Sequence, residues 1–179
     1  MCLPLRNDMK NILLTLALTS VCAVSIFAQA DKKPSTAIRP YVVKTKQSVE
    51  DLEKNLRSDN KVEDLIGGAG MQLRVAVQHD KKRPTADGEL HDASDDVYYV
   101  LEGAAQLTLG GTLENPREIS PGEWRSKTIK DGETFTIKKG DLIIVPRGTP
   151  HQRVTLKGKE FSMILIKIFA APLPPAPAK

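Results

Sequence analysis

The chain has 179 residues, of which 40% are apolar and 27% charged, as expected for one ordinary globular domain with a packed core. Its formal net charge is +4, and lysines alternate with acidic residues instead of forming a basic run. Aromatic residues make up only 4% of the chain, so the composition gives no support to a nucleic-acid-binding protein.

Residues 1–30 have the three parts of a secretory signal peptide. Arg6 and Lys10 provide the positive start, an apolar stretch follows, and Ala28-Gln29-Ala30 matches an A-x-A cleavage site. Translation could begin at Met1 or, with a cleaner positive start, at Met9. Cleavage predicts a secreted or periplasmic protein with no stable membrane span, and an uncleaved anchor is the alternative.

Both cysteines of the chain, Cys2 and Cys22, lie inside this segment. Cleavage after Ala30 would therefore leave a protein without thiols or disulfides. Any metal site in it would have to use nitrogen and oxygen ligands.

Residues 31–70 are expected to form an N-terminal arm and a helix. Ser48 is a favoured N-cap residue, and Glu50 and Asp51 would put negative charge in the first turn. Apolar residues continue at helical spacing as far as Ile66, and the glycine-rich segment 67–70 would end the helix.

From residue 71 the apolar residues alternate, beginning with Met71, Leu73, Val75 and Val77, which is typical of half-buried strands. Short strand-like runs separated by glycine-containing turns follow, at residues 97–101, 105–109, 134–137, 142–145, 152–156 and 161–169. This pattern predicts an all-β barrel or sandwich over residues 71–169. The Pro/Ala-rich residues 170–179 are predicted to be disordered.

Two histidines and two carboxylates within this region have spacings that suit one metal ion. Glu89 and His91 are two apart on a strand and project to the same face. Asp96 follows across a short acidic turn, and His151 ends a rigid turn that contains two prolines. Imidazole and carboxylate ligands suit a divalent transition metal such as Mn²⁺, Fe²⁺, Zn²⁺, Ni²⁺ or Co²⁺.

Residues 88–103 and 140–151 resemble the two signature motifs of the cupin superfamily. In the first motif the family has a His-x-His pair followed by a Glu and a Gly, and the residues at these positions are Glu89, His91, Asp96 and Gly103. In the second motif the matching residues are Gly140, Pro146, Gly148 and His151. The resemblance implies a cupin-type jelly-roll β-barrel with a short N-terminal helix.

The resemblance also implies a metal site, which the family usually builds from three histidines and one glutamate. Here the ligands would be His91, His151, Glu89 and the shorter Asp96. If Asp96 reaches the metal only through a water, the other three form a two-His-one-carboxylate set.

Four further residues are candidates for substrate contacts or for support of the ligands: His79, Tyr98, Arg147 and Arg153. His79 continues the apolar face of the first barrel strand and could be a substitute ligand, a general base or a core histidine. Tyr98 could contact a bound ligand or only pack its ring. The two arginines flank His151 and could meet an anion.

Cupins include oxygenases, isomerases and lyases, as well as proteins without catalysis. The leading hypothesis is an exported metal-dependent enzyme acting on a small molecule. A small-molecule binding module and a purely structural barrel are the alternatives. The resemblance further implies a homodimer, for which residues 36–46 could serve as an exchanged arm.

Overall fold

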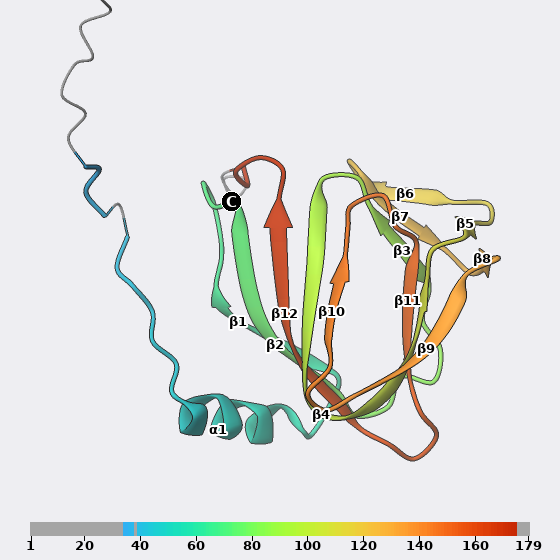
Figure 1. The fold of residues 1–179 in the computed structure, drawn as a ribbon, viewed down its shortest axis with the longest axis horizontal. Coiled ribbons are helices and arrows are strands. Elements are labelled where there is room, and N and C mark those ends of the chain that lie inside the picture. Colours follow the sequence, from blue (N-terminus) through green and yellow to red (C-terminus); the bar gives the residue numbers. More distant parts are fainter. Residues whose placement is uncertain (1–33, 38, 175–179) are drawn as a thin grey trace, which may run out of the picture. The chain divides into compact units, whose positions relative to one another are not determined.

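The computed structural model describes residues 34–37 and 39–174, so the predicted signal peptide lies outside the described residues. The chain divides into two units, one ending at Pro40 and one beginning at Tyr41. The described residues of the first unit are exposed and form no helix or strand. The second unit is an antiparallel β-barrel with one helix (Figure 1). In the described part of the chain, no helix has the length and apolarity needed to cross a membrane.

Helix α1 spans Lys46–Leu56 and begins earlier than expected. Thr45, not Ser48, is the N-cap residue, because its hydroxyl oxygen accepts the backbone N–H of Ser48 at 3.2 Å. The Ser48 hydroxyl lies within the first turn and donates to the Thr45 carbonyl. The predicted N-cap was therefore wrong by one turn, while the predicted helix is present.

The expected helical continuation to Ile66 was wrong, because residues Lys61–Ile66 form strand β1. This strand pairs antiparallel with β2, Leu73–Asp80. Asn60 fixes the turn before it, since its side-chain amide bonds both the N–H and the carbonyl of Lys82. The barrel sheet thus starts at Lys61 and not at Met71.

The barrel consists of two sheets that share one strand, β4, Ser94–Leu109 (Figure 1). The first sheet has the order β1-β2-β12-β4-β10, where β12 is Phe161–Phe169 and β10 is Leu142–Val145. The second sheet contains β4 with the strands β9, Glu133–Lys138; β11, His151–Thr155; β3, Gly88–His91; β7, Glu123–Ser126; and β6, Arg117–Ser120. A small separate sheet pairs β5, Thr112–Leu113, with β8, Ile129–Lys130.

Strand β4 changes partners at Gly103. Before this glycine β4 pairs with β12 and β10, and after it with β11 and β9. Gly103 has φ +78°, and a Cβ atom there would collide with the carbonyl oxygen of Glu160. Only glycine allows the strand to bend here while another backbone passes this closely.

The core lies between the two sheets and is formed by buried residues from both parts of β4 and from its neighbours, among them Val100, Leu107, Ile137, Phe161 and Met163. This confirms the predicted all-β barrel with a short N-terminal helix. Beyond β12 the predicted disorder is wrong for the described residues, because Leu173 exchanges backbone hydrogen bonds with Gly70 and Met71. Residues 175–179 lie outside the description.

Candidate metal centre

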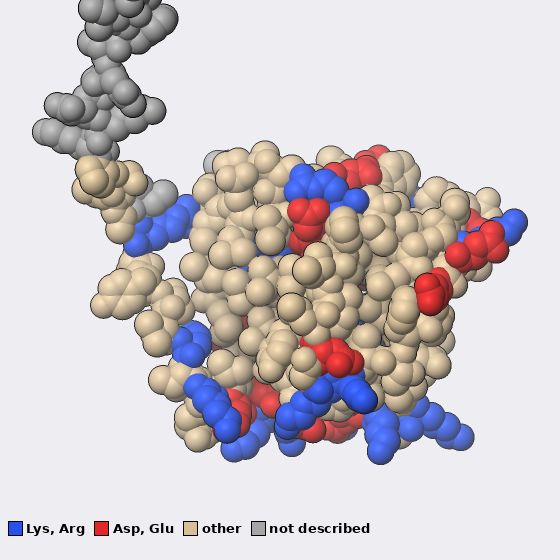
Figure 2. Space-filling model, viewed as in Figure 1, with Lys and Arg blue, Asp and Glu red and all other residues tan. Residues whose placement is uncertain are grey.

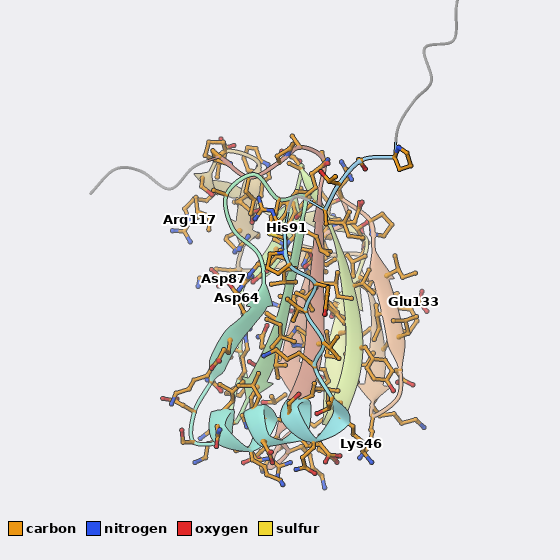
Figure 3. All side chains as sticks on the ribbon, turned by 90° about the vertical axis from the view of Figure 1, so that its left-hand side faces the viewer. Lys46, Asp64, Asp87, His91, Arg117 and Glu133 are labelled. Atoms are coloured by element: carbon orange, nitrogen blue, oxygen red, sulfur yellow. The ribbon has the colours of Figure 1, made fainter. Side chains whose placement is uncertain are left out.

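Three side chains converge inside the barrel, Glu89 and His91 from β3 and His151 from β11. Register brings them together, because β11 pairs antiparallel with β3 and His151 lies opposite Glu89. The Nε2 atoms of His91 and His151 are 3.8 and 3.9 Å from the same oxygen, Glu89 Oε2. This is a group of donor atoms that could hold a metal ion. Figure 3 shows His91 in the half of the barrel away from α1.

Both imidazoles are oriented with Nε2 toward this centre. His91 Nδ1 lies 2.6 Å from the carboxylate of Glu123, and His151 Nδ1 lies 3.0 Å from the carbonyl oxygen of Thr149. Because both partners only accept hydrogen bonds, each Nδ1 carries the proton and each Nε2 keeps its lone pair. Both Nε2 atoms are buried and have no hydrogen-bond partner among the residues that the structure describes. They are therefore oriented as metal ligands and unsatisfied without one.

The separations between donor atoms fit a transition metal. Bonds of about 2.1 Å to such an ion separate neighbouring ligand atoms by roughly 3.0–3.4 Å. The two distances to Glu89 Oε2, 3.8 and 3.9 Å, exceed the upper end of this range by about half an ångström, and all three donor atoms lie within 4.8 Å of one another. Small side-chain rotations would bring all three atoms to bonding distance, so the residues present fit such a group.

Asp96 lies directly beside the three. Its Oδ2 atom is 3.6 Å from His91 Nε2 and 3.9 Å from His151 Nε2. Each of its oxygens also has a partner, since Oδ1 accepts from Lys167 at 2.7 Å and Oδ2 from the Tyr98 hydroxyl at 3.1 Å. Burial raises the pKa of Asp96, but the neighbouring His91 and Lys167 outweigh it and lower the pKa to about 2. Asp96 is therefore an ionised carboxylate whose Oδ2 atom lies as close to the two imidazole nitrogens as Glu89 Oε2 does.

Burial sets the protonation states of two other groups in the cluster, His151 and Tyr98. Burial lowers the pKa of His151, which favours the neutral imidazole that a metal requires. Burial, as the larger cause, and the negative charge of nearby Asp96 together raise the pKa of Tyr98 well above its ordinary value. Tyr98 consequently stays a protonated phenol that can donate a hydrogen bond.

The predicted support residues separate into two groups. Tyr98 and Arg153 line the cavity next to the cluster. Arg147 does not, because its guanidinium pairs with Asp95 at 2.7 and 3.0 Å on the outside of the barrel. This pairing lowers the pKa of Asp95 to about 2.

His79 also lies away from the cluster. Its neighbour Gln78 lines the cavity, so the alternation of β2 puts His79 on the opposite face of the sheet. There its Nδ1 bonds the Ser162 hydroxyl at 2.7 Å. Of the three roles considered for His79, this buried position outside the cavity agrees with that of a core histidine.

Several residues near the cluster were missed by sequence reasoning, namely Asp80, Arg83, Glu123 and Lys167. Glu123 comes from the insertion between β4 and β9 and meets His91 only through the β3–β7 register. Lys167 lies in the predominantly apolar strand β12, where its charge alone did not indicate a place in the site. In the sequence neither residue carries a signal beyond its charge.

Comparison with known proteins supports the fold but identifies no family. No protein-family model matches the chain. An uncharacterized protein of Methanocaldococcus jannaschii is 31% identical over 85 residues, which cover 48% of this chain and 47% of that protein. The matched part thus spans about half the length of that curated relative.

Among solved structures, protein BH2720 of Bacillus halodurans is similar over 78% of this chain and 88% of its own, with 19% identity and a TM-score of 0.51. A cupin protein of Bacteroides fragilis matches over 65% of this chain and 83% of its own, with 16% identity and a TM-score of 0.40. At this level of identity the likeness concerns fold alone. The chain shares the β-barrel fold of protein BH2720, and it carries inside the barrel a His/Glu group able to bind a metal ion.

Proposed function

We propose that this protein is an exported, metal-dependent enzyme that acts on a small molecule inside the barrel. Glu89, His91 and His151 would hold one divalent transition metal, with Asp96 beside it. A single observation carries the proposal: two buried imidazole nitrogens without a partner converge on one carboxylate oxygen. Three protein ligands leave coordination positions open, as catalytic sites require.

A bound metal of this kind would supply Lewis acidity or a binding position for O₂, which oxygenase, isomerase and lyase chemistry all use. The chain provides fixed polar groups next to it. Asp96 is an ionised carboxylate beside the centre, and the Tyr98 phenol donates a hydrogen bond to it at 3.1 Å. Met163 and Leu165 supply an apolar wall that limits water in the cavity.

Elemental analysis of the purified protein tests the metal centre. We expect about one transition metal per chain in the parent and none in the double variant His91→Ala/His151→Ala. His79→Ala is the matched control, because it removes a buried histidine outside the cluster and should leave the metal content unchanged. Absence of metal from the parent after reconstitution would reject the enzyme proposal in favour of a binding or structural barrel.

We infer export from the composition of residues 1–30. N-terminal sequencing of protein recovered from the periplasm or the medium should give Asp31 as the first residue. A chain that keeps its first thirty residues and stays with the membrane would contradict cleavage.

We also infer a homodimer, formed through the outer face of the first sheet. Leu142 and Ile144 of β10 are 62% and 64% exposed, and Tyr99 and Ile168 add to the same apolar face. Figure 2 shows the middle of the molecule in this view almost without charged side chains. A sheet that is apolar on both faces is usually covered on both. Sedimentation should give a dimer, and Leu142→Lys/Ile144→Lys a monomer.

A further inference from the structure

The cavity beside the metal cluster is small. Its volume is about 90 Å³, which leaves room for a few waters or an organic molecule of few atoms. Its mouth lies at Glu89 and Arg83, whose side chains are 28% and 31% exposed, whereas His91 and His151 are almost fully buried. Met163 and Leu165 form an apolar part of the wall. A ligand must therefore be short and partly apolar.

The charges around the cavity balance without a metal. Three cationic side chains line it, Arg83, Arg153 and Lys167, and three carboxylates face them, Glu89, Asp96 and, bound to Arg153, Asp80. Just outside, Arg125 pairs with Glu123 at 3.5 Å and with Glu89 at 3.7 Å, so Arg125 and Glu123 add one charge of each sign and the set stays neutral. A divalent ion in the cluster would add two positive charges to this neutral set. The loaded cavity would then attract an anion.

The two arginines that line the cavity differ in the number of hydrogen bonds that their guanidinium groups donate. Arg153 donates to Asp80 at 2.9 and 3.3 Å and packs over the rings of Tyr98 and Phe161. It is a fixed part of the wall.

The Arg83 side chain, in contrast, forms no hydrogen bond with the described residues, only ion pairs at 3.6 Å to Glu89 and 3.9 Å to Asp80. Its backbone is anchored, because its N–H and carbonyl both bond Thr155. The Arg83 guanidinium is thus held at the mouth only by long ion pairs, and its planar set of N–H donors matches the geometry of a carboxylate.

We propose that the cavity binds a small organic carboxylate, with its carboxylate group on the Arg83 guanidinium and its short carbon chain against Met163 and Leu165. This assignment rests on the proposed metal centre, because only the loaded cavity carries excess positive charge. Glu89 lies between Arg83 and the two histidines, so the ligand would enter next to the metal. The substrate class of the enzyme is therefore a short-chain carboxylic acid.

Titration of the Co²⁺-loaded protein tests the assignment, because the visible spectrum of Co²⁺ reports changes at the centre without any need for turnover. Acetate and lactate are expected to change the spectrum saturably. Lactamide, which has no charge, and benzoate, which exceeds the cavity, are expected to have no effect. Protein without metal, followed by isothermal titration calorimetry because it lacks the Co²⁺ spectrum, should bind none of the four.

Two variants from the same loop separate the possible results, with Co²⁺ content measured in each. Arg83→Gln should keep one Co²⁺ per chain and bind acetate and lactate at least tenfold more weakly. Lys82→Gln removes an exposed charge next to it and should bind like the parent. Equal binding by Arg83→Gln and the parent, or no response of the loaded parent to either acid, would overturn the assignment while the metal centre stands. Failure to load Co²⁺ at all would overturn both proposals.

Discussion

The barrel sheets bury histidines in two places, and the environments differ in one decisive respect. His79, His91 and His151 each have a buried Nε2 atom without a hydrogen-bond partner. In the cluster, two of these atoms face each other across Glu89 and Asp96, with ring centres 5.1 Å apart. On the other side of the sheet, His79 Nε2 has one carboxylate, Glu160, at 3.8 Å and no second imidazole. A buried unpartnered nitrogen is thus not a metal site by itself, and convergence of several donors is what distinguishes one.

The largest expected effect comes from removing one ligand of the cluster. His151→Ala should weaken Zn²⁺ or Mn²⁺ binding at least about 100-fold, because loss of a ligand exceeds the 10- to 100-fold cost of losing a residue that orients one. Isothermal titration measures this directly. Similar losses in His151→Ala and His79→Ala would abolish the distinction between the two environments.

The next effect concerns the residue that orients His91. Glu123→Ala removes the acceptor 2.6 Å from His91 Nδ1 and should weaken metal binding roughly 10- to 100-fold. Glu133→Ala, at an exposed position on β9, serves as the control. Unchanged affinity in Glu123→Ala would mean that packing alone holds the ring.

A third substitution addresses the environment of His79. Ser162→Ala removes the hydroxyl that bonds the His79 ring and should lower the free energy of unfolding by about 1–3 kcal/mol. Metal affinity should not change. Denaturant unfolding combined with metal titration would separate these outcomes, and a loss of metal without a loss of stability would contradict the assignment.

The smallest effect is the pH dependence of the metal-free protein. Burial lowers the pKa of His151 below 6.5, so the unfolded chain binds more protons at this site than the folded one. The contribution of this group to stability is then complete above about pH 6.5 and is lost as the pH falls, by at most about 1.4 kcal/mol per pH unit. The free energy of unfolding of the parent should fall more steeply between about pH 6.5 and 5 than that of His151→Ala. Parallel curves would show that His151 does not contribute.

Much of the fold and of the metal cluster could be predicted from the sequence, because strand alternation and motif spacing are local signals. Glu89 and His91 share a strand face by their spacing alone, and the turn of prolines before His151 marks the second strand. β1 was not accessible, since a run of six residues with three apolar side chains fits a helix as well as a strand. Which face of β2 points inward was also undecided, because Val77 and Ala76 are equally buried.

The site residues that the sequence analysis did not identify were missed for a different reason. Glu123 and Arg83 reach the site from a long insertion and from a loop, and their positions depend on pairing between strands distant in sequence. A one-residue change in that pairing would turn each side chain to the other face. Single-sequence patterns do not specify such registers.

The contact between Glu123 and His91 has a consequence for the way this barrel can change. Glu123 belongs to the insertion between β4 and β9, which also contains β6 and β7. In this insertion the Trp124 indole donates a hydrogen bond at 2.7 Å to Asp92, the residue that follows β3. Surface insertions are ordinarily the parts of a domain that are exchanged most freely between relatives. Here an exchange that preserved length and fold would still release one ligand from its orientation. The insertion and the metal cluster should therefore be inherited, or redesigned, together.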